Sequence, residues 1–131
     1  MFNVDEETGN ITLRQGDSGS LHVDGIFGEE QPEDGKDWVL YMSIYNRQTR
    51  QIIKEMSTKP LDNQADFAFT PVLTNALQVP AAVKFYNYGY AIKLCCEADK
   101  YEDTLAVADK EVGDENLITV YPKLVEGTNN G

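Results

Sequence analysis

Three stretches of this sequence alternate apolar with other side chains at a period of two residues. The longest run, residues 88–97, places five such side chains on one face: Tyr88, Tyr90, Ile92, Leu94 and Cys96. Residues 38–45 do the same with Trp38, Leu40, Met42 and Ile44. A third, short run places Phe67 and Phe69 together. Because successive side chains of a strand point to opposite faces, each run indicates a β-strand with one buried face.

Shorter apolar segments between turn residues extend this pattern along the chain. Further strands are predicted at residues 11–13, 21–23, 50–56, 104–108 and 117–125. Thr70 can cap a helix and Pro71 suits its first position, so the segment ending at Leu77 predicts one or two helical turns. Seven or eight short strands without long helices predict an all-β fold, an antiparallel sandwich or barrel.

The 131 residues suit one domain. We expect it to cover residues 1–131, with its core within residues 11–125, a charged loop at 28–37, a polar turn at 98–103 and a flexible tail at 126–131. The alternating faces predict these core side chains: Trp38, Leu40, Ile44, Phe67, Phe69, Tyr90, Ile92 and Leu94.

The net charge of the chain excludes two classes of binding partner. Twenty-two acidic residues against eleven basic ones give a net charge of −11. Such a surface repels nucleic-acid phosphates and anionic membranes, so neither is an expected partner. The apolar runs are far shorter than the ~20 residues that span a bilayer, and the first residues have no signal-peptide pattern. Cytoplasmic synthesis is therefore expected.

The two cysteines, Cys95 and Cys96, are adjacent. Neighbours on a strand point apart, so a disulfide between them would be strained and both are predicted to be reduced. Alternation predicts that Cys96 faces the core and that Cys95 lies nearer to solvent or to a second packed layer.

The sequence contains no recognisable catalytic or metal-binding motif. The single histidine, His22, is predicted to be a surface or hydrogen-bonded strand residue, since no other histidine or spaced cysteine could complete a zinc site. The sequence has no phosphate-binding glycine loop and no nucleophile elbow. Two acidic turns, one with Asp99, Glu102 and Asp103 and one with Asp62 and Asp66, lack the calcium-loop rhythm. We therefore predict no catalytic residue, cofactor or metal, and no enzyme.

A surface for interaction is predicted on the strand at residues 38–45. Opposite its core face lie Val39, Tyr41 and Tyr45. The tyrosines could stack on sugar rings or fill a protein interface. They could also simply pack across strands on a half-covered sheet, which is the ordinary role of such side chains.

The order of these segments resembles a family of phage tail and baseplate domains, such as the N-terminal domains of upper baseplate proteins from lactococcal-type phages. The likeness lies in five segments: a strand leading to Gly16-Asp17, a hairpin of residues 39–44 and 52–56, the helical turn at 70–77, the tyrosine-rich strand at 88–94, and a closing hairpin of 104–108 with 117–120.

The resemblance implies an immunoglobulin-like antiparallel sandwich and a non-catalytic, structural role in a phage or prophage tail or baseplate. It implies other tail proteins as partners, a homo-oligomer such as a ring, and a place in the virion after cytoplasmic synthesis in a bacterial host. Two alternatives stay open. An adhesion module for carbohydrate or protein would need an exposed aromatic platform or a calcium turn, and a small enzyme would need a polar cleft with a perturbed acid or base.

Overall fold

The computed structural model describes residues 1–27, 37–96, 101–107 and 115–123. Within these ranges the chain is mostly β, with one short helix, as predicted. The elements are β1 (Asn3–Val4), β2 (Ile11–Arg14), β3 (Gly19–Asp24), β4 (Trp38–Asn46), β5 (Ile52–Thr58), β6 (Gln64–Phe69), α1 (Pro71–Ala76), β7 (Tyr86–Cys96), β8 (Tyr101–Val107) and β9 (Leu117–Tyr121).

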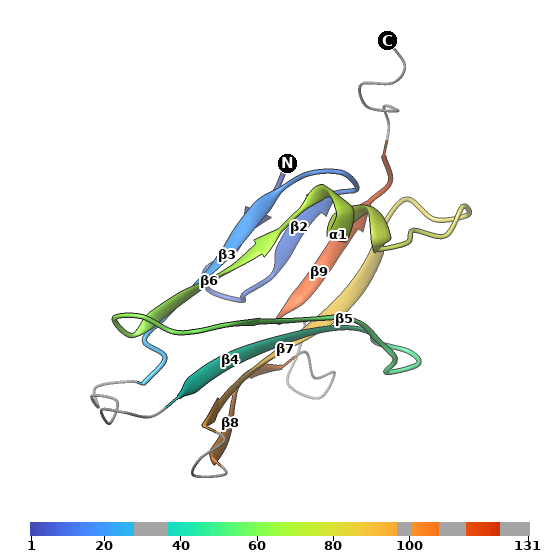
Figure 1. Ribbon diagram of the computed structural model, residues 1–131. Helices are drawn as coiled ribbons and strands as arrows, with labels where there is room; N and C mark the ends of the chain where they lie inside the picture. The colour runs from blue at the N-terminus through green and yellow to red at the C-terminus, as the bar shows by residue number, and fades with distance from the viewer. Residues whose placement is uncertain (28–36, 97–100, 108–114, 124–131) are drawn as a thin grey trace.

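The strands form two sheets (Figure 1). The larger sheet has the order β1-β2-β9-β7-β4-β5, and β8 also pairs with β7. β4 lies along one edge of β7, so the other edge is shared by β9 at residues 86–89 and β8 at residues 91–96. The smaller sheet consists of β3 and β6, paired antiparallel. Apolar side chains from both sheets form one hydrophobic core, so the small sheet packs on the large one.

The prediction of a purely antiparallel sandwich is wrong at one place. β2 and β9 pair in parallel, with Ile11 opposite Ile118 and Leu13 opposite Val120. All four side chains are completely buried. The large sheet is therefore mixed, and a strand from the first part of the chain, β2, pairs with the last described strand, β9.

The core follows the alternating faces. In β6 every second residue is buried, and Leu40, Met42 and Ile44 of β4 are fully enclosed. Burying each such side chain contributes about 1.5–3 kcal/mol. Seven of the eight predicted core residues are buried. The exception is Trp38, which is half-buried at the start of β4 and packs edge-on against Phe27, with ring centroids 5.2 Å apart.

Strand boundaries differ from the prediction at several places: β5 covers Ile52–Thr58 instead of 50–56, and β9 ends at Tyr121, before the predicted end at 125. β8 begins at Tyr101, within the stretch predicted as a polar turn, because its backbone pairs with the second half of β7. The two-residue strand β1 was not predicted, since two residues carry no period. The predicted loop at 28–37 lies outside the described residues except for Asp37, and the predicted tail at 126–131 lies wholly outside them.

The helix α1 begins as predicted. The Thr70 hydroxyl accepts a hydrogen bond from the Leu73 amide at 3.2 Å, and Pro71 occupies the first turn. This cap satisfies a backbone donor that the helix leaves free. No helix in the described part of the chain has the length and apolar character needed to cross a membrane.

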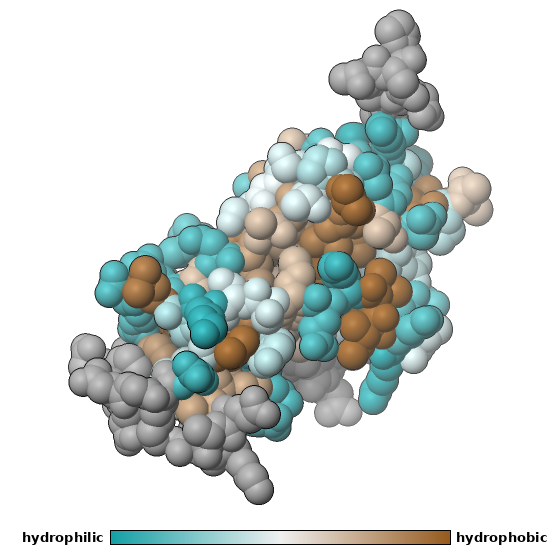
Figure 2. Space-filling model, in the orientation of Figure 1, coloured by the Kyte–Doolittle hydropathy of each residue, from teal (hydrophilic) through white to brown (hydrophobic). Residues whose placement is uncertain are grey.

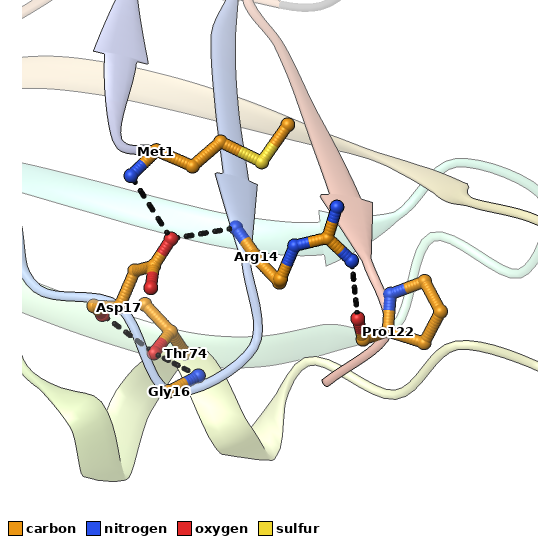
Figure 3. A network of polar contacts seen from close by, with 6 residues as sticks. All are labelled: Met1, Arg14, Gly16, Asp17, Thr74 and Pro122. Atoms are coloured by element: carbon orange, nitrogen blue, oxygen red, sulfur yellow. Dashed lines mark hydrogen bonds and ion pairs between the residues drawn. The ribbon is translucent and has the colours of Figure 1, made fainter. Parts of the chain in front are cut away.

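The Gly16-Asp17 pair joins the β2–β3 turn to α1 (Figure 3). The buried Thr74 hydroxyl donates to the Asp17 carbonyl at 2.8 Å and accepts from the Gly16 amide at 3.1 Å. The Asp17 carboxylate accepts from the Arg14 amide and also lies 3.3 Å from the Met1 amino group. Arg14 in turn donates to the Pro122 carbonyl at 2.8 Å. This short motif therefore holds α1 against the ends of β2 and β9.

Candidate functional site

The predicted interaction residues share one face of the large sheet. Val39, Tyr41 and Tyr45 all lie on the side of β4 that faces away from the core. Tyr41 is 37% exposed, whereas Val39 and Tyr45 are half-buried. The three side chains therefore form a row on an accessible sheet surface, in the arrangement that alternation predicts.

Two isoleucines of β5 extend this row, and sequence reasoning did not include them. Ile52 pairs with Tyr45, and the register shifts next to this pair, so Ile53 stands in a β-bulge. Ile52 is 55% exposed and Ile53 is 38% exposed. Figure 2 shows a hydrophobic patch where β5 begins, beside the β4–β5 turn. The signal in the sequence was the Ile-Ile doublet, which interrupts the alternation. We call Val39, Tyr41, Tyr45, Ile52 and Ile53 the assembly face.

Polar pairs lie within and beside the assembly face, since Ser43 stands between Tyr41 and Tyr45 on β4 and Lys93 lies opposite Tyr41 on β7. Lys93 lies 3.5 Å from the Glu102 carboxylate, and the Ser43 hydroxyl donates to Glu55 at 3.3 Å. Both pairs are exposed, so each contributes little to stability. A mixture of apolar and polar side chains is the usual composition of a non-obligate protein interface. The strand β5 also pairs with β4 alone among the described strands, which leaves its other edge unpaired.

The cysteines lie as predicted: Cys96 is completely buried and Cys95 is partly exposed beside Val39. Burial raises the pKa of the Cys95 thiol, the nearby Glu102 carboxylate raises it further, and Lys93 opposes this shift. Since the thiolate is the reactive form, Cys95 should react slowly for a surface thiol.

We expect a thiol-specific reagent to label one cysteine slowly in the native protein and both in denaturant. With an aromatic disulfide as the reagent, each reaction releases one coloured thiolate, and its absorbance gives the number of labelled cysteines. Replacing Cys95 with serine should abolish the native reaction and leave one thiol to react after unfolding. Equal, rapid labelling of both groups in the native protein would contradict the observed burial.

The single histidine is a hydrogen-bonded surface residue, as predicted. His22 of β3 lies opposite Asp66 of β6, with Nδ1 2.8 Å from the carboxylate, and both side chains are exposed. The hydrogen bond to Asp66 raises the pKa of His22, and the charges of Asp66 and Asp24 add to this effect. The pair stands on the solvent side of the small sheet, where water screens its charges.

The His22–Asp66 pair should stabilise the folded state only at a pH low enough to protonate His22. The folded pKa lies above the ordinary value of 6.5, so protonated His22 favours the folded state. The stabilisation is complete below about pH 6.5, the ordinary pKa of histidine, and is lost as the pH rises through the pKa of His22 in the folded state. A proton NMR titration of the His22 ring should give the raised pKa, and Asp66→Asn should lower it. An unchanged pKa in Asp66→Asn would refute the assigned cause.

A second feature is a hollow of about 550 Å³ between β3 and the turn that joins β1 to β2. Its described lining is Val4, Asp5, Glu6, Gly9, Ser20, Leu21, His22, Val23, Asp24, Tyr90 and Ile92. The Tyr90 hydroxyl donates to the Gly9 carbonyl, and burial raises the pKa of Tyr90 to about 12. Tyr90 therefore stays neutral and serves as a fixed donor. Sequence reasoning did not find this hollow.

Acidic side chains do not assemble into a metal centre in the part of the chain that is described. No three histidine, cysteine, aspartate or glutamate side chains come together there. Of the two acidic turns considered for calcium, Asp99 lies outside the described residues. Asp66 is engaged by His22.

Comparison of the chain with protein-family models, curated proteins and solved structures finds no match. The chain's own geometry is therefore the basis for its function. That geometry offers two surfaces: the assembly face on the large sheet, and the hollow beside β3.

Proposed function

We propose that this chain is a non-catalytic, structural component of a phage or prophage tail or baseplate, built as an immunoglobulin-like sandwich. The observation that carries this proposal is the assembly face, a partly exposed set of aromatic and aliphatic side chains beside the edge of β5 that pairs with no other described strand. Exposed apolar patches mark protein contacts, and a role in assembly requires such a surface and no catalytic group.

Two observations support the immunoglobulin-like arrangement. In that fold one sheet holds the C, F and G strands and the other holds B and E, an order that β4, β7 and β9 and the pair β3–β6 reproduce. The Tyr88 hydroxyl, near the start of β7, donates to the Gln78 carbonyl at 2.6 Å. A tyrosine at this place that bonds back to upstream backbone is a hallmark of such sandwiches. The parallel pairing of β2 with β9 is the main departure from an all-antiparallel sandwich.

The assembly face would contact other tail or baseplate proteins in two ways. Tyr41, Ile52 and Ile53 would lose exposed apolar area, and the free edge of β5 would pair with a partner strand. Copies in a tail repeat around a symmetry axis, so a ring of identical chains is the expected oligomer. The net charge of −11 would favour basic partners over nucleic acid or anionic membranes.

Mass spectrometry of purified virions, or of particles induced from the source organism, tests the assignment. The proposal requires the protein in intact particles, after synthesis in the bacterial cytoplasm. Its absence from particles whose other tail proteins are detected would refute a structural role in the virion.

A matched pair of variants tests the surface. Tyr41→Ser combined with Ile52→Ser should reduce incorporation into particles at least about tenfold, because interface hot spots are large apolar side chains. Leu61→Ser combined with Val72→Ser removes two apolar side chains elsewhere that are even more exposed, at 75% and 83%, and should leave incorporation unchanged. Circular dichroism checks that both variants fold. Equal incorporation of the two variants would remove the assembly face from the proposal.

An adhesion module that binds carbohydrate is the second candidate, favoured by the exposed ring of Tyr41 on the outer face of the large sheet. Aromatic rings on such a surface can stack on sugars. Retention on a glycan array that Tyr41→Ala abolishes, together with absence from particles, would establish this function in place of assembly.

A further inference from the structure

The strand β3 has one unpaired edge. It pairs with β6 along all six of its residues, from Gly19 opposite Phe69 to Asp24 opposite Gln64. Among the described strands it pairs with no other. Because each residue of a strand directs its backbone polar groups alternately to either edge, β3 offers a row of donors and acceptors on its second side.

That edge borders the hollow. All residues from Ser20 to Asp24 line it, whereas Gly19 does not, because the Phe2 ring lies directly on Gly19. Five residues of strand span about 13 Å, so the hollow follows β3 for the length of a short extended peptide. Its volume of about 550 Å³ is within the range of sites that enclose a ligand.

The walls of the hollow differ in chemistry. Leu21, Tyr90 and Ile92 come from the inner faces of the two sheets and give an apolar floor. Acidic groups stand at its margins: Asp5 and Glu6 on the β1–β2 turn, and Asp24 at the end of β3. Of the described residues that line the hollow, none is a lysine or arginine.

We propose that the hollow binds an extended segment of a partner protein, with alternating apolar and basic residues, which adds as a strand to the free edge of β3. Its backbone pairs with β3, its apolar side chains point inward to Tyr90 and Ile92, and its lysines or arginines meet Asp5, Glu6 and Asp24. The inference uses a surface separate from the assembly face and does not rest on the tail assignment.

The far wall of the hollow is fixed before any peptide binds. The Tyr90 hydroxyl donates to Gly9, and the Asn116 amide donates to the Thr8 carbonyl at 3.0 Å, so two points tie the turn to the large sheet. A preorganised wall lowers the ordering cost of binding.

The test uses the full ¹⁵N-labelled chain and an acetylated, amidated octapeptide of alternating lysine and valine. We expect the peptide to shift the backbone amide resonances of residues 20–24 and to slow hydrogen exchange in β3. An octapeptide of alternating glutamate and valine should not bind. The lysine–valine peptide with every backbone nitrogen methylated keeps its charge but cannot donate to a strand, and it should not bind either.

Two triple variants separate the local site from the general attraction of a basic peptide to an acidic protein. Asp5→Asn with Glu6→Gln and Asp24→Asn removes the margin charges and should weaken binding about tenfold. The asparagine at position 5 keeps a carbonyl acceptor for the Glu7 amide. The control changes net charge equally but away from the hollow, with these substitutions on β5 and β8: Glu55→Gln, Glu102→Gln and Asp103→Asn.

The control variant should bind the peptide within about twofold of the unaltered protein, since distant exposed charges are screened by salt. Three results would overturn the proposal: resonance shifts away from β3, equal binding of the methylated peptide, or equal weakening in both triple variants. Circular dichroism and the unperturbed amide spectrum establish that each variant is folded.

Discussion

Phe67→Ala is expected to lower the free energy of unfolding by about 3–5 kcal/mol. Phe67 is only 2% exposed and lies on the inner face of β6, where the small sheet packs on the large one. A two-stranded sheet has little stability of its own, so β3 and β6 depend on this packing. Removing the ring leaves a cavity between the sheets that neither sheet can easily fill.

Phe85→Ala provides the matched control for this prediction. Phe85 is 45% exposed and packs on the Tyr121 ring at a centroid distance of 5.7 Å. Its loss should cost about 1 kcal/mol or less, because an exposed ring gains little from burial. Urea unfolding followed by the fluorescence of the single tryptophan, Trp38, measures both variants. Equal costs for the two substitutions would show that Phe67 does not stand between packed sheets.

The parts of the fold that were predictable are those with a local cause. Alternation within β4, β6 and β7 depends only on neighbouring residues, and it identified their buried faces correctly. The cap at Thr70 and the first turn at Pro71 are also local. The parallel pairing of β2 with β9 joins residues about a hundred positions apart, and nothing in either segment reveals its partner. The antiparallel prediction failed for that reason.

The same distinction applies to the two surfaces. Val39, Tyr41 and Tyr45 follow from alternation, whereas Ile53 enters the assembly face through a bulge that depends on pairing with β4. The hollow depends on which edge of β3 is left unpaired, a property of the sheet order and not of any single segment. The far wall of the hollow includes Gly9, whose close contact with Tyr90 and Asn116 cannot be seen in the sequence.

Gly9→Ala is expected to cost about 2–4 kcal/mol of unfolding free energy. Gly9 has a φ of +76°, which a residue with a Cβ adopts at a cost of about 1 kcal/mol. An added Cβ would also overlap Asn116 Oδ1 and lie 2.8 Å from the Tyr90 hydroxyl. Hydrogen bonds hold the Tyr90 hydroxyl and the Asn116 backbone in place, so relieving the overlap costs about a further 1–3 kcal/mol.

Gly25→Ala separates these two causes. Gly25 has a φ of +61°, but a Cβ there would meet no atom within 4 Å. Gly25→Ala should therefore lower the free energy of unfolding only by the backbone penalty of about 1 kcal/mol. Chemical denaturation of the two variants gives the difference, which isolates the crowding between Gly9, Tyr90 and Asn116. In Tyr90→Phe the obstructing hydroxyl is gone, so adding Gly9→Ala to that background should cost less than it does in the unaltered protein. If Gly9→Ala and Gly25→Ala were equally destabilising, the close approach of the turn to β7 would be wrong, and with it the fixed wall of the hollow.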